Sequence, residues 1–239
     1  MIIFENVSKK FGTGAALSDI SFLVDKGEFV FLVGPTGSGK TTVLRLITRE
    51  LFPTQGKVIV NNWDVIKLPH SKIPELRKKI GVIFQDLKLL ADRTIFENTA
   101  LPLDVAGLEP EQIEKRVEEI LKQVGIFEHK DKFPSQLSGG ELQRVAIARA
   151  LALSPEIILA DEPTGNLDPA TSWEIVKVLS DINEQGTTVV MATHNADIIK
   201  SLSKRVLELS QGNLVKDSKT KHKAKDKEEN KEEKEEEKQ

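Results

Sequence analysis

The chain has 239 residues, of which 39% are hydrophobic, and this is enough apolar material for one substantial core or two small ones. Lys and Arg number 34 and Asp and Glu 37, and the formal net charge of −3 argues against a protein that coats nucleic acid. The absence of cysteine excludes a disulfide framework, thiol catalysis and cysteine-ligated zinc. No apolar run approaches the ~20 residues of a membrane-spanning helix, and residues 1–5 do not resemble a signal peptide. We therefore expect a soluble protein that works inside the cell.

The N-terminal part of the chain predicts three short strands. Apolar and β-branched residues fill segments 2–7, 18–24 and 28–33, and glycine-containing turns separate these segments. The third segment is almost continuously apolar and ends at a glycine, which is typical of a strand buried on both faces of a parallel sheet. A helix is expected to follow at about 39–46, with apolar side chains along one side.

The pattern becomes helical between residues 85 and 154. Thr94-x-x-Glu97 and Ser138-x-x-Glu141 both match the capping box, in which two side chains satisfy backbone donors at the start of a helix. Each box therefore predicts a helix that begins directly after its Thr or Ser.

Strand patterns return after this helical region. Apolar segments at 157–160 and 188–192 flank a helix predicted at 169–184. Strands that alternate with helices indicate a largely parallel sheet, here with a helical insertion. No internal repeat is visible, so we expect one catalytic unit in each chain.

The segment 217–239 differs from the rest of the chain, because most of its residues are Lys, Asp or Glu. Such a segment buries too little apolar surface to offset its chain entropy, so we predict a disordered tail. Two interpretations stay open: a solubilising tail, or a lysine-rich stretch at 219–227 that touches anionic lipid.

A complete phosphate-loop motif follows the third predicted strand. Residues 34–41 match G-x-x-x-x-G-K-[ST], in which glycines let the backbone wrap a phosphate at the start of the next helix. Lys40 would bring charge to the β- and γ-phosphates, and the hydroxyl of Thr41 would reach Mg²⁺. A glycine-rich turn without a ligand is the alternative, but it leaves Lys and Thr at the helix start unexplained. The predicted nucleotide-binding residues are Gly34, Pro35, Thr36, Gly37, Ser38, Gly39, Lys40, Thr41 and Thr42.

Two carboxylates stand at the end of the predicted strand at 157–160. Ligands of open α/β sheets bind at the carboxyl ends of the strands, so this is a suitable place for a metal and a base. Asp161 is the candidate Mg²⁺ partner, directly or through another group, and Glu162 is the candidate that polarises the attacking water. An acidic pair that simply meets solvent is the alternative.

Residues 137–141 read L-S-G-G-E and predict a second anion site. Two glycines at a helix start expose backbone N–H groups, although Ser138 could equally be an ordinary N-cap without a ligand. A single nucleotide has one γ-phosphate. Two anion cradles in one chain therefore suggest that two chains share each nucleotide.

In combination these motifs resemble the ATP-binding cassette (ABC) ATPases. The phosphate loop, Gln85 after a strand, the L-S-G-G-E run, the Asp-Glu pair and His194 occur in the family's order between residue 1 and about 216. The resemblance implies an α/β fold of the P-loop NTPase type that binds ATP and Mg²⁺. Its parts would be a mostly parallel core sheet, an N-terminal antiparallel β subdomain and a helical subdomain inserted at about 86–155.

The resemblance also implies roles for individual residues. Gln85 would sense Mg²⁺ and the attacking water, while His194 would contact the γ-phosphate and hold Glu162 in place as the second catalytic residue. Asp168 would belong to a loop that communicates across a homodimer. Phe11 fits the position at which relatives stack an aromatic ring on adenine, with a buried core side chain as the alternative. The residues that would face the ATP of the opposite protomer are Ser138, Gly139, Gly140 and Glu141.

The sequence around Gln85 points to one branch of the family. The chain shows no second cassette, coiled-coil insertion or fused membrane span, which favours an ATPase subunit docked to a permease at the cytoplasmic face of the cell membrane. The stretch Gln85–Thr94 would contact this permease, and it is most similar to the ATPases of bacterial cell division, which regulate cell-wall hydrolysis. No nucleic-acid partner is expected. The alternatives are a transporter of the lipoprotein-release or macrolide-export type and a soluble ABC-type nucleotide switch.

Overall fold

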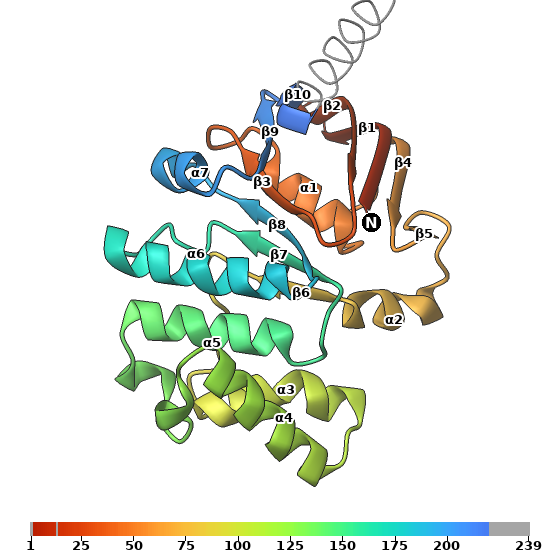
Figure 1. Cartoon of the computed structure of the whole chain (residues 1–239). Helices are drawn as coiled ribbons and strands as arrows, with labels where there is room; N and C mark the ends of the chain where they lie inside the picture. The colour runs from red at the N-terminus through yellow and green to blue at the C-terminus, as the bar shows by residue number, and fades with distance from the viewer. Residues whose placement is uncertain (1, 13, 220–239) are drawn as a thin grey trace, which may run out of the picture.

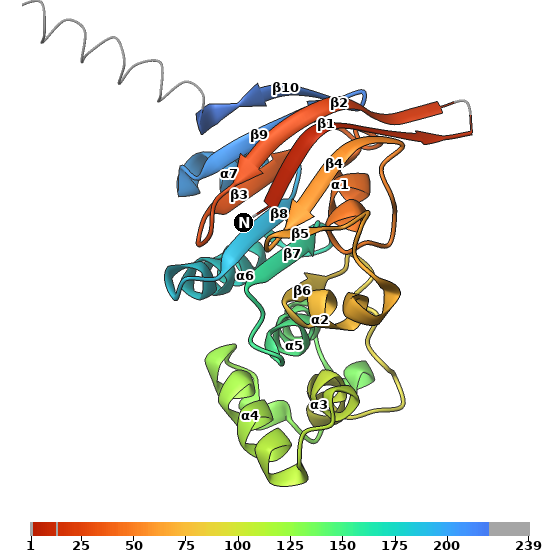
Figure 2. The same cartoon turned by 90° about the vertical axis from the view of Figure 1, so that its right-hand side faces the viewer.

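The computed structural model describes residues 2–12 and 14–219 and arranges them as two β-sheets with helices packed against them (Figures 1 and 2). The strands are β1 (Ile2–Phe11), β2 (Gly14–Val24), β3 (Phe29–Val33), β4 (Gln55–Val60), β5 (Trp63–Asp64), β6 (Ile80–Ile83), β7 (Ile157–Asp161), β8 (Thr188–Ala192), β9 (Arg205–Ser210) and β10 (Asn213–Asp217). The α-helices are α1 (Lys40–Ile47), α2 (Ile73–Lys78), α3 (Ile95–Ala106), α4 (Pro110–Gln123), α5 (Gly139–Leu151), α6 (Pro169–Glu184) and α7 (Ala196–Leu202). Short 3-10 helices cover His70–Lys72, Phe127–His129 and Pro134–Gln136.

The central sheet carries the strands that lead to the predicted site. Its order is β10-β9-β3-β8-β7-β6, in which the neighbours from β9 to β6 run parallel and β10 runs antiparallel to β9. Strands β3, β7 and β8 are apolar over almost their whole length because both of their faces are covered. The predicted mostly parallel core sheet is confirmed, and the carboxyl ends of β3, β6, β7 and β8 lie at one edge of it.

The N-terminal sheet is antiparallel, as the family resemblance implied. Its order is β2-β1-β4-β5, and helix α1 lies between it and the central sheet (Figures 1 and 2). Ile2, Phe4 and Val58 of this sheet join Leu46 of α1 and Leu32 of β3 in one buried apolar cluster. Burial of these large side chains fixes α1, and with it the loop that precedes α1, against both sheets.

The segment that we predicted as a helical subdomain contains α3, α4 and α5, with α5 nearest the central sheet (Figure 2). The capping boxes are confirmed: Thr94 and Ser138 each accept a hydrogen bond from the backbone N–H of the Glu three residues later, and that Glu accepts one in return. Ile120 and Leu121 of α4 and Val145 of α5 belong to the same buried cluster as Ile158 of β7, so the helices share a core with the sheet. No helix in the described residues is long and apolar enough to cross a membrane.

Strand β10 reaches the first residue of the segment that we predicted as a tail, 217–239. Asp217 ends β10, and the ammonium of Lys219 forms an ion pair with Glu28 at 3.5 Å. These first residues of the predicted tail are therefore held against the domain by their charges. The rest of the predicted tail, residues 220–239, lies outside the described residues.

Candidate nucleotide-binding site

The phosphate loop, residues 34–41, connects β3 to α1, and its glycines are required by its shape. Gly34 and Gly39 have φ angles of 148° and 109°, in the region that favours glycine. A Cβ atom at Gly34 would collide with the carbonyl oxygen of Leu209, and one at Gly39 would lie 2.8 Å from the carbonyl oxygen of Ala16. The loop is therefore packed tightly from outside and can be built only with glycine at these two positions.

Inside this loop, polar groups are arranged around a place for an anion. The buried Lys40 donates hydrogen bonds from Nζ to the carbonyl oxygens of Gly34 (2.7 Å) and Pro35 (3.2 Å). The buried hydroxyl of Ser38 has no hydrogen-bond partner among the described residues. A buried polar group without a partner is costly in a folded protein, and a phosphate oxygen is the kind of group that would satisfy it. The loop thus fits a phosphate.

Thr41 and Asp161 meet between the start of α1 and the end of β7. Burial raises the pKa of the Asp161 carboxyl and the nearby Glu162 raises it further, while a hydrogen bond with the Thr41 side chain and the charge of Lys40 lower it. A hydroxyl and a carboxylate are oxygen ligands of the kind that Mg²⁺ takes. Residues 2–12 and 14–219 contain no cluster of three or more His, Asp or Glu that could hold a metal alone. These two residues therefore fit a Mg²⁺ ion that also binds nucleotide phosphates.

Glu162 follows β7 and is held from two sides. Its Oε2 lies 3.0 Å from Nδ1 of His194, and its Oε1 lies 3.7 Å from Nζ of Lys40. Its backbone has a φ of 49°, which is unusual for a non-glycine residue, and its N–H donates to the carbonyl oxygen of Ala192. The side chain of Glu162 is 12% exposed, whereas that of His194 is 71% exposed. This carboxylate is fixed in position yet reachable by water, as a general base must be.

Predicted residues from four separate chain segments line one cleft of about 280 Å³. Ala16 also lines it and was not predicted, since nothing in its residue type distinguishes it from other alanines. The full lining is Ala16, Thr36, Gly37, Gly39, Lys40, Thr41, Thr42, Gln85, Asp161, Glu162 and His194.

The loop after Gln85 is tied to helix α5 by Arg149, which the sequence analysis did not single out. Leu87 and Lys88 have positive φ angles of 52° and 50°, and their carbonyl oxygens accept hydrogen bonds from the Arg149 guanidinium. Burial lowers the pKa of Arg149. Because Ser138 caps the start of α5, this one helix connects the loop of Gln85 to the L-S-G-G-E segment.

The signature turn, residues 137–141, lies at the start of α5 and away from the lining of the cleft. The Ser138 hydroxyl and backbone N–H bond to the Glu141 carboxylate at 2.6 and 2.7 Å, and these bonds lower the pKa of Glu141. The other Glu141 oxygen lies 3.0 Å from Nδ1 of His129. A Cβ at Gly140 would collide with the methyl group of Thr171, so this glycine also has a packing role.

Asp168 caps helix α6 beside the signature turn. Its carboxylate accepts hydrogen bonds from the backbone N–H (3.0 Å) and hydroxyl of Thr171, which lower the pKa of Asp168. Leu167 lies next to Gly139, since a Cβ there would come 3.3 Å from the Leu167 side chain. The structure thus places Asp168, which we predicted to communicate across a homodimer, beside the predicted signature residues of the same chain.

Phe11 stands apart from the cleft. It ends β1, on the hairpin that projects from the N-terminal sheet (Figure 2), and its side chain is 51% exposed. The ammonium of Lys9 lies 5.0 Å from the centre of the ring. The ring is therefore no core side chain, and it does not contribute to the lining described above.

Comparisons with known proteins agree on the family. The sequence model of the ABC transporter family matches residues 17–165. The cell division ATP-binding protein FtsE of Bacillus subtilis is 49% identical over 218 residues, which cover 91% of this chain and 96% of FtsE. FtsE of Escherichia coli is 46% identical over 215 residues, covering 90% and 97% of the two chains.

Solved structures show the same relationship. The dimeric post-hydrolysis state of the ATP-binding cassette MJ0796, bound to ADP and Pi, superposes with a TM-score of 0.82 at 38% identity, covering 91% of this chain and 98% of the cassette. A cassette from Clostridium perfringens, part of an ABC transporter complex, gives a TM-score of 0.83 at 31% identity over 90% of this chain and 87% of its own. The chain therefore belongs to the ABC transporter family, as an ATPase of that family similar to FtsE.

Proposed function

We propose that this chain is the ATP-hydrolysing subunit of a membrane complex, in which two copies close on two Mg-ATP molecules and drive an FtsX-type permease. The permease would in turn regulate cell-wall hydrolysis during bacterial cell division. The observation that carries the proposal is the cleft in which Glu162 is held between Lys40 and His194. The similarity to FtsE directs the proposal to cell division.

Each group at the cleft has a proposed task. The phosphate loop would bind the phosphates, and Thr41, Gln85 and Asp161 would hold the Mg²⁺ ion. When bound, Mg²⁺ supplies positive charge that neutralises the developing charge on the phosphates. Glu162 accepts a proton from the attacking water, and His194 keeps the Glu162 carboxylate in position. Phe11, which is half-exposed, would stack its ring on adenine.

The signature turn serves the ATP that the second copy holds. Ser138, Gly139, Gly140 and Glu141 lie outside the lining of this chain's own cleft, so a nucleotide that they bind would be one held by another copy. Charge-assisted hydrogen bonds of about 1.5–3 kcal/mol each, formed from both copies, would stabilise the closed homodimer. Asp168, beside the signature turn, would transmit the closure between the copies. The dimeric state of the similar cassette bound to ADP and Pi supports this arrangement.

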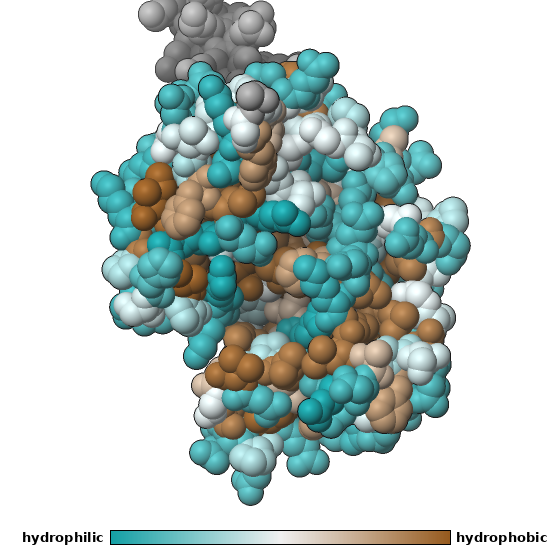
Figure 3. All heavy atoms as spheres, turned by 180° about the vertical axis from the view of Figure 1, so that it is seen from behind, coloured by the Kyte–Doolittle hydropathy of each residue, from teal (hydrophilic) through white to brown (hydrophobic). Residues whose placement is uncertain are grey.

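The permease would dock beside the Gln85 loop and hold the chain at the cytoplasmic face of the membrane. A groove of about 410 Å³ lies between the central sheet and the helical region, and Arg77, Phe84, Pro102 and Arg149 are among its lining residues. In Figure 3 the surface is hollowed between the two parts of the molecule, and apolar side chains gather along the helical side of the hollow. A groove with apolar walls and a few cations suits a short amphipathic segment of a membrane protein. The stretch Gln85–Thr94 adjoins it.

The test is affinity purification of the Glu162→Gln variant from detergent-solubilised membranes with Mg-ATP, followed by mass spectrometry. We expect a permease together with a cell-wall hydrolase or a division protein. The matched control is the double variant Glu162→Gln, Lys40→Ala, which should not close on ATP and should recover less of the permease.

Other outcomes would contradict parts of the proposal. A permease for lipoprotein release or macrolide export would move the chain to a sister branch with the same chemistry. Ribosomes or nucleic acid in place of a permease would overturn the membrane partner while leaving the ATP site intact.

A further inference from the structure

The C-terminal hairpin, formed by β9, β10 and the turn at Gln211 and Gly212, covers the outside of the phosphate loop. Strand β9 runs parallel to β3, with Glu208 opposite Val33, the last residue before the loop. The Gly212 N–H donates to the carbonyl oxygen of Ser38 (3.2 Å), inside the loop. The Leu209 carbonyl packs directly against Gly34, as described above. The hairpin therefore contacts both the first glycine of the loop and its central serine.

The turn of the hairpin has little freedom to shift. Gln211 and Gly212 have φ angles of 48° and 79°, and a Cβ at Gly212 would lie 2.9 Å from the carbonyl oxygen of Ala16. The carbonyl oxygen of Gly212 accepts a hydrogen bond from the N–H of Ser18 (2.8 Å). Ala16 lines the nucleotide cleft. A displacement of this turn would therefore be passed on to the cleft by direct contact.

Strand β10, however, is weakly held by its own packing. It stands at the edge of the central sheet and pairs only with β9 within the described part of the chain. None of its five residues is fully buried. An edge strand with so little apolar burial needs another source of stability to keep its turn in place.

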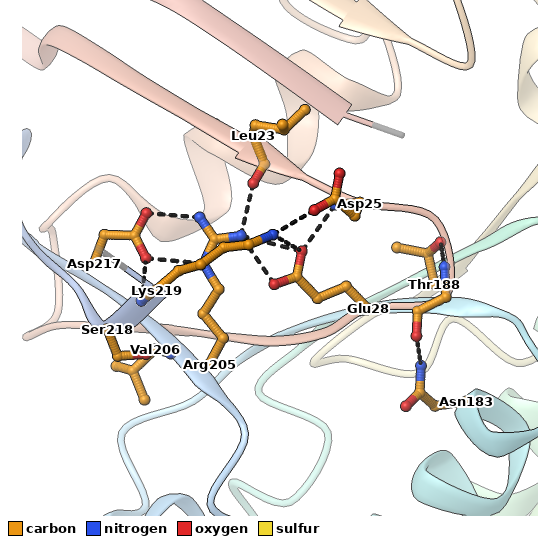
Figure 4. Close-up of polar contacts among 11 residues, drawn as sticks. Leu23, Asp25, Glu28, Asn183, Thr188, Arg205, Val206, Asp217, Ser218 and Lys219 are labelled. Carbon is orange, nitrogen blue, oxygen red and sulfur yellow. Dashed lines mark hydrogen bonds and ion pairs between the residues drawn. The ribbon is translucent and has the colours of Figure 1, made fainter. Parts of the chain in front are cut away.

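That source is a group of charged residues at the other end of the hairpin, shown in Figure 4, which we call the latch: Asp25, Glu28, Arg205, Asp217 and Lys219. Arg205, at the start of β9, bonds both carboxylate oxygens of Asp217, at the end of β10, from Nε (2.8 Å) and Nη2 (2.6 Å). Its Nη1 donates to the Leu23 carbonyl (2.6 Å) and to Glu28 (3.0 Å), in and after β2. The side chain of Arg205 is only 8% exposed.

Lys219 completes the latch from the chain beyond β10. Its ammonium pairs with Asp25 and lies 3.5 Å from Glu28, and its backbone N–H donates to Asp217 (3.0 Å). The Ser218 hydroxyl accepts a hydrogen bond from the backbone N–H of Val206 (2.9 Å). The latch thus joins both strands of the hairpin to the turn that leads into β3. Bidentate pairing by a planar guanidinium fixes this geometry in a way that an ammonium does not.

We propose that Arg205 is a positioning residue for ATP binding. By latching β10 to β9 and to the β2–β3 turn, it holds the Gly212 turn against Ser38 and Gly34 and keeps the phosphate loop in its binding shape. The inference rests on the proposed role of the phosphate loop in binding ATP.

The experiment measures the Kd of ATP by calorimetry, well below the unfolding temperature, for Arg205→Lys, Asp217→Asn and Gly212→Ala. Arg205→Lys keeps the charge but loses the bidentate pair, and Gly212→Ala disturbs the turn without touching the latch. We expect Kd to rise by about tenfold for Gly212→Ala and by several-fold for the two latch variants. Amide hydrogen exchange of residues 34–40 should become faster in all three variants.

A matched control separates positioning from general stability. Arg116 is another arginine that joins two elements, through the carbonyl oxygens of Leu151 (3.2 Å) and Ala152 (3.3 Å) and the Ser154 hydroxyl (2.9 Å), in the helical region. Arg116→Lys should lower the unfolding temperature while leaving both the Kd of ATP and the exchange of residues 34–40 unchanged.

Two further outcomes keep the inference separate from the proposed function. An unchanged Kd for both Arg205→Lys and Asp217→Asn, with ATP binding lost in Lys40→Ala, would overturn the role of the latch alone. Unchanged binding in Lys40→Ala would overturn the phosphate-loop assignment itself. If Arg205→Lys does not fold, Asp217→Asn decides the question by the same criteria, because it removes the other half of the same ion pair.

Discussion

The two helix starts that carry glycine-rich motifs, at α1 and at α5, are built in opposite ways. At α1 the N-cap residue is Gly39, and among residues 2–12 and 14–219 no side chain caps the helix and no group bonds the buried hydroxyl of the neighbouring Ser38. At α5 the capping box of Ser138 and Glu141 pairs these two side chains with each other's backbone N–H groups. The first helix start therefore leaves a buried polar side chain for a ligand to satisfy, whereas the polar side chains of the second are already paired with its own backbone.

This difference indicates how each motif binds its ligand. Buried polar groups without partners carry a cost that a ligand removes, so the phosphate loop points to a ligand held within its own chain. The signature turn is stable alone and lies near the surface, so any ligand it takes can arrive with another molecule. Both helix N-termini attract anions. The burial of the unpaired side chain at the first one is what indicates that its anion is held by the same chain.

The largest effect is expected at the group that would do the chemistry in the first site. Glu162→Gln should lower the rate of phosphate release by about 10²–10⁴-fold, since it removes a general base, while ATP still binds. The variant should accumulate as a dimer in saturating Mg-ATP, which light scattering measures. A variant that stays monomeric under these conditions, with the permease also present, would break the proposed sharing of ATP between two copies.

Loss of the loop cation should weaken binding itself. Lys40→Ala removes charge-assisted hydrogen bonds to phosphate, and we expect the Kd of ATP to rise by about 10²-fold, as measured by calorimetry. Lys79→Ala is the matched control, because Lys79 forms a surface ion pair with Glu156 (2.7 Å) outside the cleft. Equal ATP affinity in the two variants would contradict the assignment of the loop.

The signature turn should separate stability from dimerisation. Ser138→Ala should lower the free energy of unfolding by about 1 kcal/mol, the usual cost of a lost N-cap, and leave the monomer's Kd for ATP unchanged. Thr94→Ala removes the other capping box and supplies the matched loss of stability. In the Glu162→Gln background, Ser138→Ala should also abolish the ATP-dependent dimer. A dimer that persists would show that Ser138 is a cap and nothing more.

The smallest effect concerns Asp161 in the ligand-free protein. Burial raises the pKa of this carboxyl in the folded state, so ionising it lowers the free energy of unfolding. This loss of stability is absent below the ordinary pKa of Asp, where the carboxyl is protonated in both states, and it is fully present above the raised pKa. Asp161→Asn should therefore raise Tm by about 1–2 °C near neutral pH and leave it unchanged below about pH 3.5. The same variant should bind Mg-ATP more weakly. A Tm that falls at neutral pH would contradict the burial cost.

Local sequence predicted much of the fold because local physical chemistry sets it. The capping boxes at Thr94 and Ser138 start helices where the sequence placed them, and the strand over 188–192 and the helix over 169–184 have the predicted limits. Continuous apolar runs identified the buried strands of the parallel sheet, since both faces of such strands must be covered. The order of the motifs then indicated the family.

The positions of single side chains across the molecule were not predictable in this way. Arg149 bonds carbonyl oxygens of the Gln85 loop, and Arg205 reaches Glu28, 177 positions earlier in the chain. Nothing in their neighbouring residues distinguishes these arginines from the others in the sequence. Ala16 lines the cleft only because the N-terminal sheet packs over α1.

The positions of the phosphate loop, of the acidic pair after β7 and of the two capped helix starts could thus be predicted from the sequence. Glycine geometry, capping and apolar periodicity each depend on only a few neighbouring residues. The folded structure adds that Glu162 also lies 3.7 Å from Lys40, that Arg149 bonds the loop after Gln85, and that the C-terminal hairpin contacts the phosphate loop. The physical reason is that these contacts join segments far apart in the chain, and packing of the two cores brings such segments together.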